Sequence, residues 1–311
     1  MSEPGSPVLS IVVGIVSDTT ETVARADLLA DCLEGLAQQV DAPPFEIIVP
    51  HLEHVEGLEK VKARFPDVSF LPAPDVVAHP GGREHHDVLR ARGLAAAKGD
   101  LVGLLEDHAR PDPHWAANVV EAHRLTHAAV GGAIENGVDR ALNWAVYYCD
   151  FGRYQNPVPA GETPFASDAN TTYKRSELES VRSVWGDAFR EVVVNDALKS
   201  SGKTIVLDPK VIVYQNRRGL TLGAALHERF SWGRSYAATR LALLTTPKRF
   251  AYAALSPVLP ALLLVRMGRT AWARKRHFAG FVRSVPFLVP LLISWSLGET
   301  IGYLAPQRLR G

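Results

Sequence analysis

The chain has 311 residues, of which 47% are hydrophobic and 22% are charged, which is enough for one sizeable α/β domain with an appendage and excludes large-scale disorder. Its 34 lysines and arginines nearly balance its 33 aspartates and glutamates, so the charge of the whole chain gives no support for nucleic-acid binding. The two cysteines, Cys32 and Cys149, have no metal-ligand or redox spacing, and the acidic, turn-forming N-terminus predicts no cleaved signal peptide.

The first half of the chain alternates strand patterns with helical patterns. Residues 8–16 form a continuous apolar run rich in β-branched side chains, which is typical of a strand buried on both faces of a parallel sheet. Residues 28–40 repeat apolar side chains at helical spacing, and residues 45–49 predict the next strand, which completes a βαβ unit. The other predicted elements are strands at 68–71, 101–105, 129–134 and 204–207 and helices at 87–98, 113–125 and 192–200. This alternation predicts an α/β fold with a doubly wound, mostly parallel sheet.

Three potential metal ligands follow the predicted strand at 101–105. In an open parallel sheet, ligands bind beyond the carboxyl ends of the strands. Glu106, Asp107 and His108 stand at such a strand end, where carboxylates are costly to bury unless they are paired or coordinated. A hard divalent cation would relieve that cost. The alternative is a polar strand end that turns into a loop, with Asp112 capping the next helix.

Four segments occur in a recognisable order and spacing: Leu9-Ser-Ile-Val-Val, Glu46-Ile-Ile-Val, the positions Arg90, Gly93, Ala97 and Gly99, and Leu104-Leu105-Glu106-Asp107-His108. Together they resemble the nucleotide-sugar-binding half of family 2 glycosyltransferases, and the resemblance extends over residues 9–214. It implies a GT-A fold, a nucleotide-sugar donor, and donor contacts from Arg90 and Asp107. It also implies that Glu106, Asp107 and His108 stand for the family's DxD motif and hold a divalent metal, Mn²⁺ or Mg²⁺. The histidine favours manganese, because imidazole suits that ion.

The second half of the resemblance begins at residues 166–175, a polar loop followed by a strand, where it assigns Asp168 and Asn170 to the donor site. An ordinary turn that contains an asparagine is the alternative interpretation. Glu191 occupies the place of the last acid in the family's Glu-Asp pair, which implies that it is the general base for the acceptor hydroxyl.

The acidic pair at this point of the chain is incomplete, because Arg190 replaces its first acid. Asp187 and Asp196 are therefore rival candidates for the general base. Glu191 has a second interpretation as a solvated carboxylate at the start of a helix, stabilised by the helix dipole.

Two further segments concern the nucleobase and the sugar. The family's aspartate pair after the second strand is replaced here by Pro50-His51-Leu52-Glu53, so Asp18, His51 and Glu53 are the candidates for nucleobase contacts. The aromatic residues between 144 and 154 line a sugar subsite in one interpretation and pack in the core in the other.

Residues 227–240 predict an amphipathic helix that lies in a membrane interface. Two arginines and two aromatic residues recur at helical spacing, namely Arg229, Trp232, Tyr236 and Arg240. Such a strip suits aromatic rings at headgroup depth and arginines on phosphates. Arg234, in the same segment, is a predicted contact of the donor diphosphate. A solvated basic helix face is the alternative.

The C-terminal part of the chain has a different composition. Apolar runs at 250–265 and 285–305 flank a basic stretch and predict attachment to the cell membrane. The run at 285–305 is near the length that crosses a bilayer, whereas the basic flanks of the shorter run at 250–265 predict an in-plane or re-entrant segment with both ends in the cytoplasm. A transmembrane hairpin and a pair of soluble core helices are the alternatives. We therefore expect a catalytic domain at 1–220, an interfacial helix at 221–249 and membrane-associated helices at 250–311.

These features predict an inverting glycosyltransferase that acts on a lipid-linked or envelope-glycan acceptor at the cytoplasmic face of the cell membrane. A transferase for single sugars is favoured over a processive synthase, because the chain lacks the several membrane spans of a translocation pore. The alternative from another class is a catalytically silent membrane protein that binds a sugar nucleotide or a protein partner.

Overall fold

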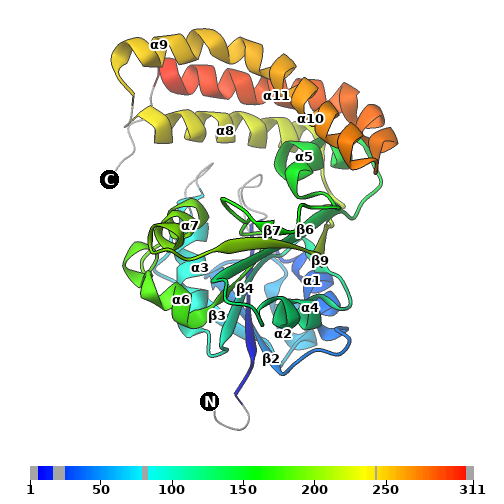
Figure 1. The fold of residues 1–311 in the computed structure, drawn as a ribbon, viewed down its shortest axis with the longest axis vertical. Coiled ribbons are helices and arrows are strands. Elements are labelled where there is room, and N and C mark those ends of the chain that lie inside the picture. The colour runs from blue at the N-terminus through cyan, green and yellow to red at the C-terminus, as the bar shows by residue number, and fades with distance from the viewer. Residues whose placement is uncertain (1–5, 17–24, 79–82, 242–243, 306–311) are drawn as a thin grey trace. The chain divides into compact units, whose positions relative to one another are not determined.

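The computed structural model describes residues 6–16, 25–78, 83–241 and 244–305 (Figure 1). The contacts within the chain divide it into two compact units. Unit 1 contains residues 1–137 and 154–216, and unit 2 contains residues 138–153 and 217–311. The short segment 138–153 therefore packs with the C-terminal helices, although it lies within the catalytic region expected from the sequence.

A mixed β-sheet forms the centre of unit 1. Its described strands are β1 (Leu9–Gly14), β2 (Phe45–Leu52), β3 (Ser69–Ala73), β4 (Leu101–Glu106), β5 (Ala109–Pro111), β6 (Ala129–Asn136), β7 (Gly161–Glu162), β8 (Asn170–Lys174) and β9 (Ile205–Gln215). The order is β3-β2-β1-β4-β8-β6-β9-β5, and β7 pairs with β9. Strands β3 to β4 in this order are parallel, as predicted, whereas β8 is antiparallel to both of its neighbours. The α/β fold class is confirmed, with antiparallel pairing confined to the second half of the sheet.

Helices cover both faces of this sheet (Figure 1). They are α1 (Leu29–Ala37), α2 (Leu58–Arg64), α3 (Glu84–Ala96), α4 (Trp115–Ala122), α6 (Arg175–Ser180) and α7 (Glu191–Ser200). Helix α3 packs unusually close to β1, because a Cβ on Gly93 would lie 2.5 Å from Cγ1 of Val12. On the other face, a Cβ on Gly103 would lie 3.1 Å from the ring of Trp115. Small residues at these two positions let α3 and α4 lie directly on the central strands.

Unit 2 is helical. It contains α5 (Ala141–Asp150), α8 (Leu222–Leu241), α9 (Thr246–Leu255), α10 (Leu259–Arg274) and α11 (Phe278–Leu304). Helices α8 and α11 run side by side (Figure 1). Their backbones meet at glycines: a Cβ on Gly298 would lie 2.1 Å from the carbonyl oxygen of Phe230, and one on Gly233 would lie 2.2 Å from that of Trp295.

The aromatic residues of α5 belong to the core of unit 2. Trp144, Tyr147 and Tyr148 are at most 5% exposed and share one cluster with apolar residues of α11. A Cβ on Gly280 would lie 2.9 Å from the Trp144 ring. Core packing, rather than a sugar subsite, therefore explains these three rings.

Two stretches of the described chain are long and apolar enough to cross a membrane, Thr246–Arg274 and Phe278–Leu304. Only 11% and 33% of their most apolar windows are buried within the protein. Helices that formed the core of a soluble protein would be mostly buried, so this exposure favours a lipid environment over the soluble alternative.

Candidate active site

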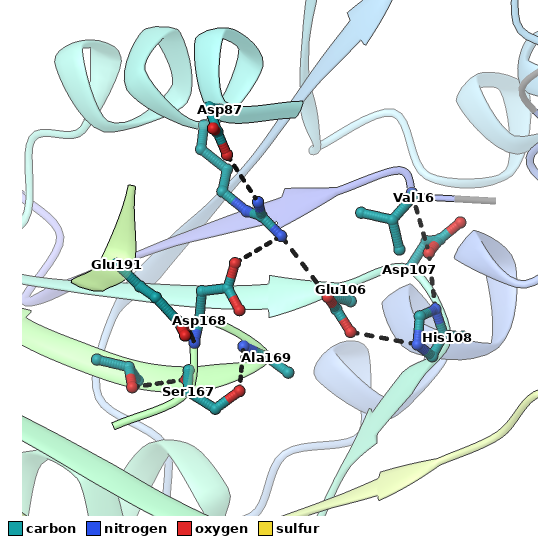
Figure 2. Close-up of polar contacts among 11 residues, drawn as sticks. Val16, Asp87, Glu106, Asp107, His108, Ser167, Asp168, Ala169 and Glu191 are labelled. Carbon is teal, nitrogen blue, oxygen red and sulfur yellow. Dashed lines mark hydrogen bonds and ion pairs between the residues drawn. The ribbon is translucent and has the colours of Figure 1, made fainter. Parts of the chain in front are cut away.

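The end of β4 brings three neighbouring polar side chains into one buried cluster (Figure 2). The chain stays paired to β1 beyond the strand, since the Asp107 N–H donates to the carbonyl oxygen of Gly14 at 2.9 Å. Oδ1 of Asp107 accepts from the Val16 N–H at 3.4 Å. His108 lies between the two acids, with Nε2 3.2 Å from Oε2 of Glu106 and Nδ1 3.2 Å from Oδ1 of Asp107.

The position of His108 determines the charge of this cluster. Burial disfavours the imidazolium, but hydrogen bonds to Asp107 and Glu106 outweigh it and raise the pKa of His108 to about 9. Burial would raise the pKa of Glu106, yet the hydrogen bond to His108 and the charges of His108 and Arg90 lower it to about 2. Without a bound cation, the imidazolium therefore neutralises much of the acidic charge.

The donor atoms of the cluster suit a divalent cation. Two carboxylates and an imidazole form an oxygen and nitrogen set that manganese and magnesium sites use. Oδ2 of Asp107 is buried and has no hydrogen-bond partner in the described part of the protein, so a cation there would satisfy it. Among the residues that the structure describes, no three such side chains are already arranged around a metal position. Both ring nitrogens of His108 face carboxylates, so the imidazolium would have to lose the proton of one nitrogen before that nitrogen could coordinate.

Arg90 connects this cluster to a second group of acids. It projects from α3 with its guanidinium 2.8 Å from Oδ2 of Asp168, 3.6 Å from Oε1 of Glu106 and 3.6 Å from Oδ1 of Asp87. Burial alone would lower the pKa of Arg90, but these carboxylates outweigh it and raise the pKa. The donor contact that the sequence resemblance implies for Arg90 stays a prediction, and the structure adds that its guanidinium lies among three acids.

Glu191 begins α7 and lies beside Asp168 (Figure 2). Its Oε2 accepts from the backbone N–H of Asp168 at 2.6 Å. Burial and the charge of the Asp168 carboxylate raise the pKa of Glu191 well above its usual range, and Arg90 opposes this only partly. Glu191 is thus joined through Asp168 and Arg90 to Glu106, which unites the predicted base with the predicted metal ligands.

The rival bases lie elsewhere. Asp196 is on the outer side of α7 and pairs with Lys199 at 2.8 Å. Asp187 is exposed. In the described structure neither has a contact with Arg90 or Asp168, which favours Glu191.

Asn170 has a structural role that the sequence did not predict. Its Nδ2 donates to the carbonyl oxygens of Ala133 and Val211 at 2.9 and 3.0 Å, and its Oδ1 accepts from Nε1 of Trp115 at 2.9 Å. The residue is only 1% exposed. These hydrogen bonds tie three elements around the sheet and give Asn170 a structural role, and its contact with the donor stays a prediction.

Replacing Asn170 with Ala should lower the free energy of unfolding by about 3 kcal/mol, because three buried polar groups lose their partner. Chemical denaturation would measure the change. Donor affinity of the folded fraction should stay the same. A stable variant with weakened donor binding would instead restore the role suggested by the sequence.

The candidates for nucleobase contacts are only partly described. Asp18 lies outside the described residues. His51 is 2% exposed and makes a hydrogen bond through Nδ1 to the carbonyl oxygen of Leu52 at 2.7 Å, which leaves little of it for a ligand. Glu53 is exposed just after β2 and stays the accessible candidate.

The predicted interfacial strip on α8 needs a correction at Arg229. Its Nη1 lies 2.5 Å from Oδ1 of Asp150 and its guanidinium lies 4.2 Å from the ring centre of Trp232. The side chain is buried within unit 2, so it does not reach lipid phosphates. The partner on α5 is 79 residues away in sequence, which is why helical spacing alone suggested an outward position. Arg234 lies on the same helix, and its contact with the donor stays a prediction.

Comparisons with known proteins agree with this geometry. The family model described as "Glycosyl transferase family 2" matches residues 21–182, slightly more than half of the chain. The structure of the mannosyltransferase PcManGT from Pyrobaculum calidifontis, in complex with GDP-Man and Mn²⁺, is similar with a TM-score of 0.52 and 17% identity over 94% of this chain and 87% of that chain. S. aureus TarS 1–349, in complex with UDP-GlcNAc, gives 0.46 and 12% over 94% and 92%. No curated protein matches the sequence. At 17% identity the likeness to the mannosyltransferase shows the fold alone.

Proposed function

Because the chain belongs to glycosyl transferase family 2, we propose that it is an inverting glycosyltransferase that uses a nucleotide-sugar donor. The observation that carries this proposal is the continuous chain of contacts from His108 and Glu106 through Arg90 to Asp168 and Glu191. It joins a site suited to a diphosphate and its cation to a carboxylate suited to an acceptor hydroxyl.

Glu106, Asp107 and His108 would hold the divalent cation, Mn²⁺ or Mg²⁺. When bound, such a cation neutralises the charge that develops on the leaving diphosphate. The unsatisfied Oδ2 of Asp107 supports this role. The positive charge of the protonated His108 ring competes with the cation for the two carboxylates. The metal ion and the proton on the coordinating ring nitrogen would therefore exclude each other.

Glu191 would accept the proton of the acceptor hydroxyl as that hydroxyl attacks the anomeric carbon. The backbone N–H of Asp168 fixes one of its carboxylate oxygens. Arg90 fixes the Asp168 side chain, so the base is oriented by a backbone contact and a buried ion pair. Asp168 would also contact the donor, the role that the sequence resemblance implies.

The acceptor would be lipid-linked or an envelope glycan, reached from the cytoplasmic face of the cell membrane. The two apolar stretches 246–274 and 278–304 support membrane attachment, because most of their surface is not covered by protein. Residues 1–220 would carry catalysis, residues 221–249 would lie at the interface, and residues 250–311 would enter the lipid. Arg234, on the interfacial helix, would reach the donor diphosphate.

Replacing His108 with Ala should weaken metal-dependent donor binding about tenfold or more, which corresponds to about 1.4 kcal/mol from one lost ligand. Calorimetric titration of a nucleotide-sugar with and without Mn²⁺ would measure it. His114→Ala is the matched control, since His114 is exposed only six residues further along the chain. Equal metal dependence in both variants would remove His108 from the site.

A further inference from the structure

The two units carry opposite charge, which the nearly neutral whole chain conceals. Unit 2 contains 17 lysines and arginines against 4 aspartates and glutamates, a net charge of +13. Unit 1 contains the same number of basic residues against 29 acids, a net charge of −12. Such a separation within one chain makes unit 2 a binder of negatively charged surfaces in its own right.

The four acids of unit 2 offset little of this charge at its surface. Glu228 is buried, the Asp150 side chain is 9% exposed, and they pair with Arg217 and Arg229 at 3.2 and 2.5 Å. Glu299 is buried and accepts hydrogen bonds from Trp295 and Tyr303 at 3.1 Å. Asp139 pairs with Arg283 at 2.6 Å. By contrast, Lys248, Arg266, Arg269 and Lys275 are exposed cations of α9, α10 and the following turn.

Apolar side chains occupy the same outer surface. On α10 and the turn before it, Val258, Leu262, Val265 and Trp272 recur at helical spacing and are between 53% and 67% exposed. A second stripe on α11 contains Ile293, Leu297, Ile301 and Leu304, which are between 38% and 54% exposed. A water-soluble surface rarely leaves two such stripes uncovered.

The exposed part of α10 changes character along its length. Its first turns are apolar, whereas Arg266 and Arg269 interrupt the stripe further along and a basic turn follows Trp272. When one end of a helix enters the acyl region of a bilayer, aromatic and basic residues at its other end stay at the depth of the headgroups. The phosphate groups of lipids are then within reach of the cations.

From these observations we infer that the α9–α11 surface of unit 2 binds bilayers with anionic headgroups in preference to neutral ones. The inference rests on the proposed membrane attachment and adds the charge of the lipid. A neutral bilayer would cover the apolar stripes but has no net negative surface charge to attract the cations. An acidic protein or a nucleic acid would pair with the cations but leave the stripes in water. An anionic bilayer satisfies both, and each cation near it increases binding about fivefold.

Flotation of the full-length protein with lipid vesicles tests this inference. We expect binding to phosphatidylcholine vesicles to become at least about tenfold tighter when a third of the lipid is phosphatidylglycerol. The difference should disappear between about 0.05 and 0.5 M salt, because screening shortens the range of the attraction. Equal binding to both vesicle types would overturn the inference and leave membrane attachment intact, whereas binding to neither would overturn both.

A matched pair of triple variants locates the effect. Arg266→Gln, Arg269→Gln and Lys275→Gln together should reduce the preference for anionic vesicles by about 10- to 100-fold without changing binding to neutral ones. Lys60→Gln, Arg124→Gln and Lys210→Gln remove the same charge from exposed positions of unit 1 and should leave the preference unchanged. An equal loss in both variants would mean that total charge, and not the α9–α11 surface, governs lipid selection.

Discussion

Replacing Glu191 with Gln should lower glycosyl transfer by about a hundredfold to ten-thousandfold, the range that general-base catalysis supplies. Gln keeps the shape of the side chain and can still accept from the backbone N–H of Asp168, but it cannot take a proton from the acceptor. Donor affinity should barely change, because the proposed diphosphate site is at the end of β4 and not at Glu191. Initial rates and donor titrations on the same preparation would separate the two effects.

Asp196→Asn is the control for this substitution, since it neutralises another acid of α7 that is exposed and paired with Lys199. Transfer should stay within about twofold of the unmodified enzyme, as expected of a surface change. Near-normal turnover in the Glu191→Gln variant would rule Glu191 out as the base and direct attention to Asp168.

The pH dependence of transfer should report the unusual environment of Glu191. Its raised pKa means that it is protonated, and cannot act as a base, at pH values where an ordinary glutamate is ionised. Transfer at low acceptor concentration should therefore increase with pH through that raised pKa. Asp168→Asn removes the neighbouring negative charge, so the rise should move to lower pH. A rise at the same or higher pH in this variant would contradict the pairing.

Replacing Arg90 with Met should lower the free energy of unfolding by about 3 to 5 kcal/mol, because a buried cation is lost while its carboxylate partners stay. Asp168, Glu106 and Asp87 would then repel one another in a buried site. The deficit should shrink as the pH falls, since protonation removes the unpaired charges. Denaturation curves at several pH values would measure both effects.

Arg92→Met is the matched control on the same helix. Arg92 is exposed and pairs with Asp75, which is also exposed, so the loss should be at most about 1 kcal/mol. Equal stabilities of the two variants would show that Arg90 does not hold the acids together.

Local patterns were enough to predict the first half of the fold. The apolar patterns of β1 and β4 can each be recognised within the six residues of the strand. The predicted metal ligands that follow β4 are adjacent in sequence. The strands and these ligands depend on neighbours along the chain, which a sequence pattern records. Gly93, which lets α3 lie close to Val12 of β1, was noticed only because it was among the residues that carried the family resemblance.

The connections between distant segments could not be predicted in the same way. Asp168 and Glu191 are separated by 23 residues, and their contact depends on how β8, α6 and α7 fold back. The buried role of Asn170 depends on carbonyl groups of β6 and β9, whose pairing has no sequence signature. Burial of Arg229 depends on Asp150, and the helical spacing of its own segment pointed to the surface.

We propose that the protein transfers a sugar from a nucleotide-sugar at the cluster around Glu106, Asp107, His108 and Glu191. The most direct test of this proposal is the release of nucleoside diphosphate by the full-length protein in anionic vesicles, with a panel of nucleotide-sugars, Mn²⁺ and a membrane lipid extract as the source of acceptor. We predict release that requires the metal and the lipid extract and that falls about a hundredfold or more in the Glu191→Gln variant. The contradicting result would be that the protein binds a nucleotide-sugar but, with every donor and with either Mn²⁺ or Mg²⁺, releases no more nucleoside diphosphate than the Glu191→Gln variant. That result would identify a silent sugar-nucleotide-binding protein.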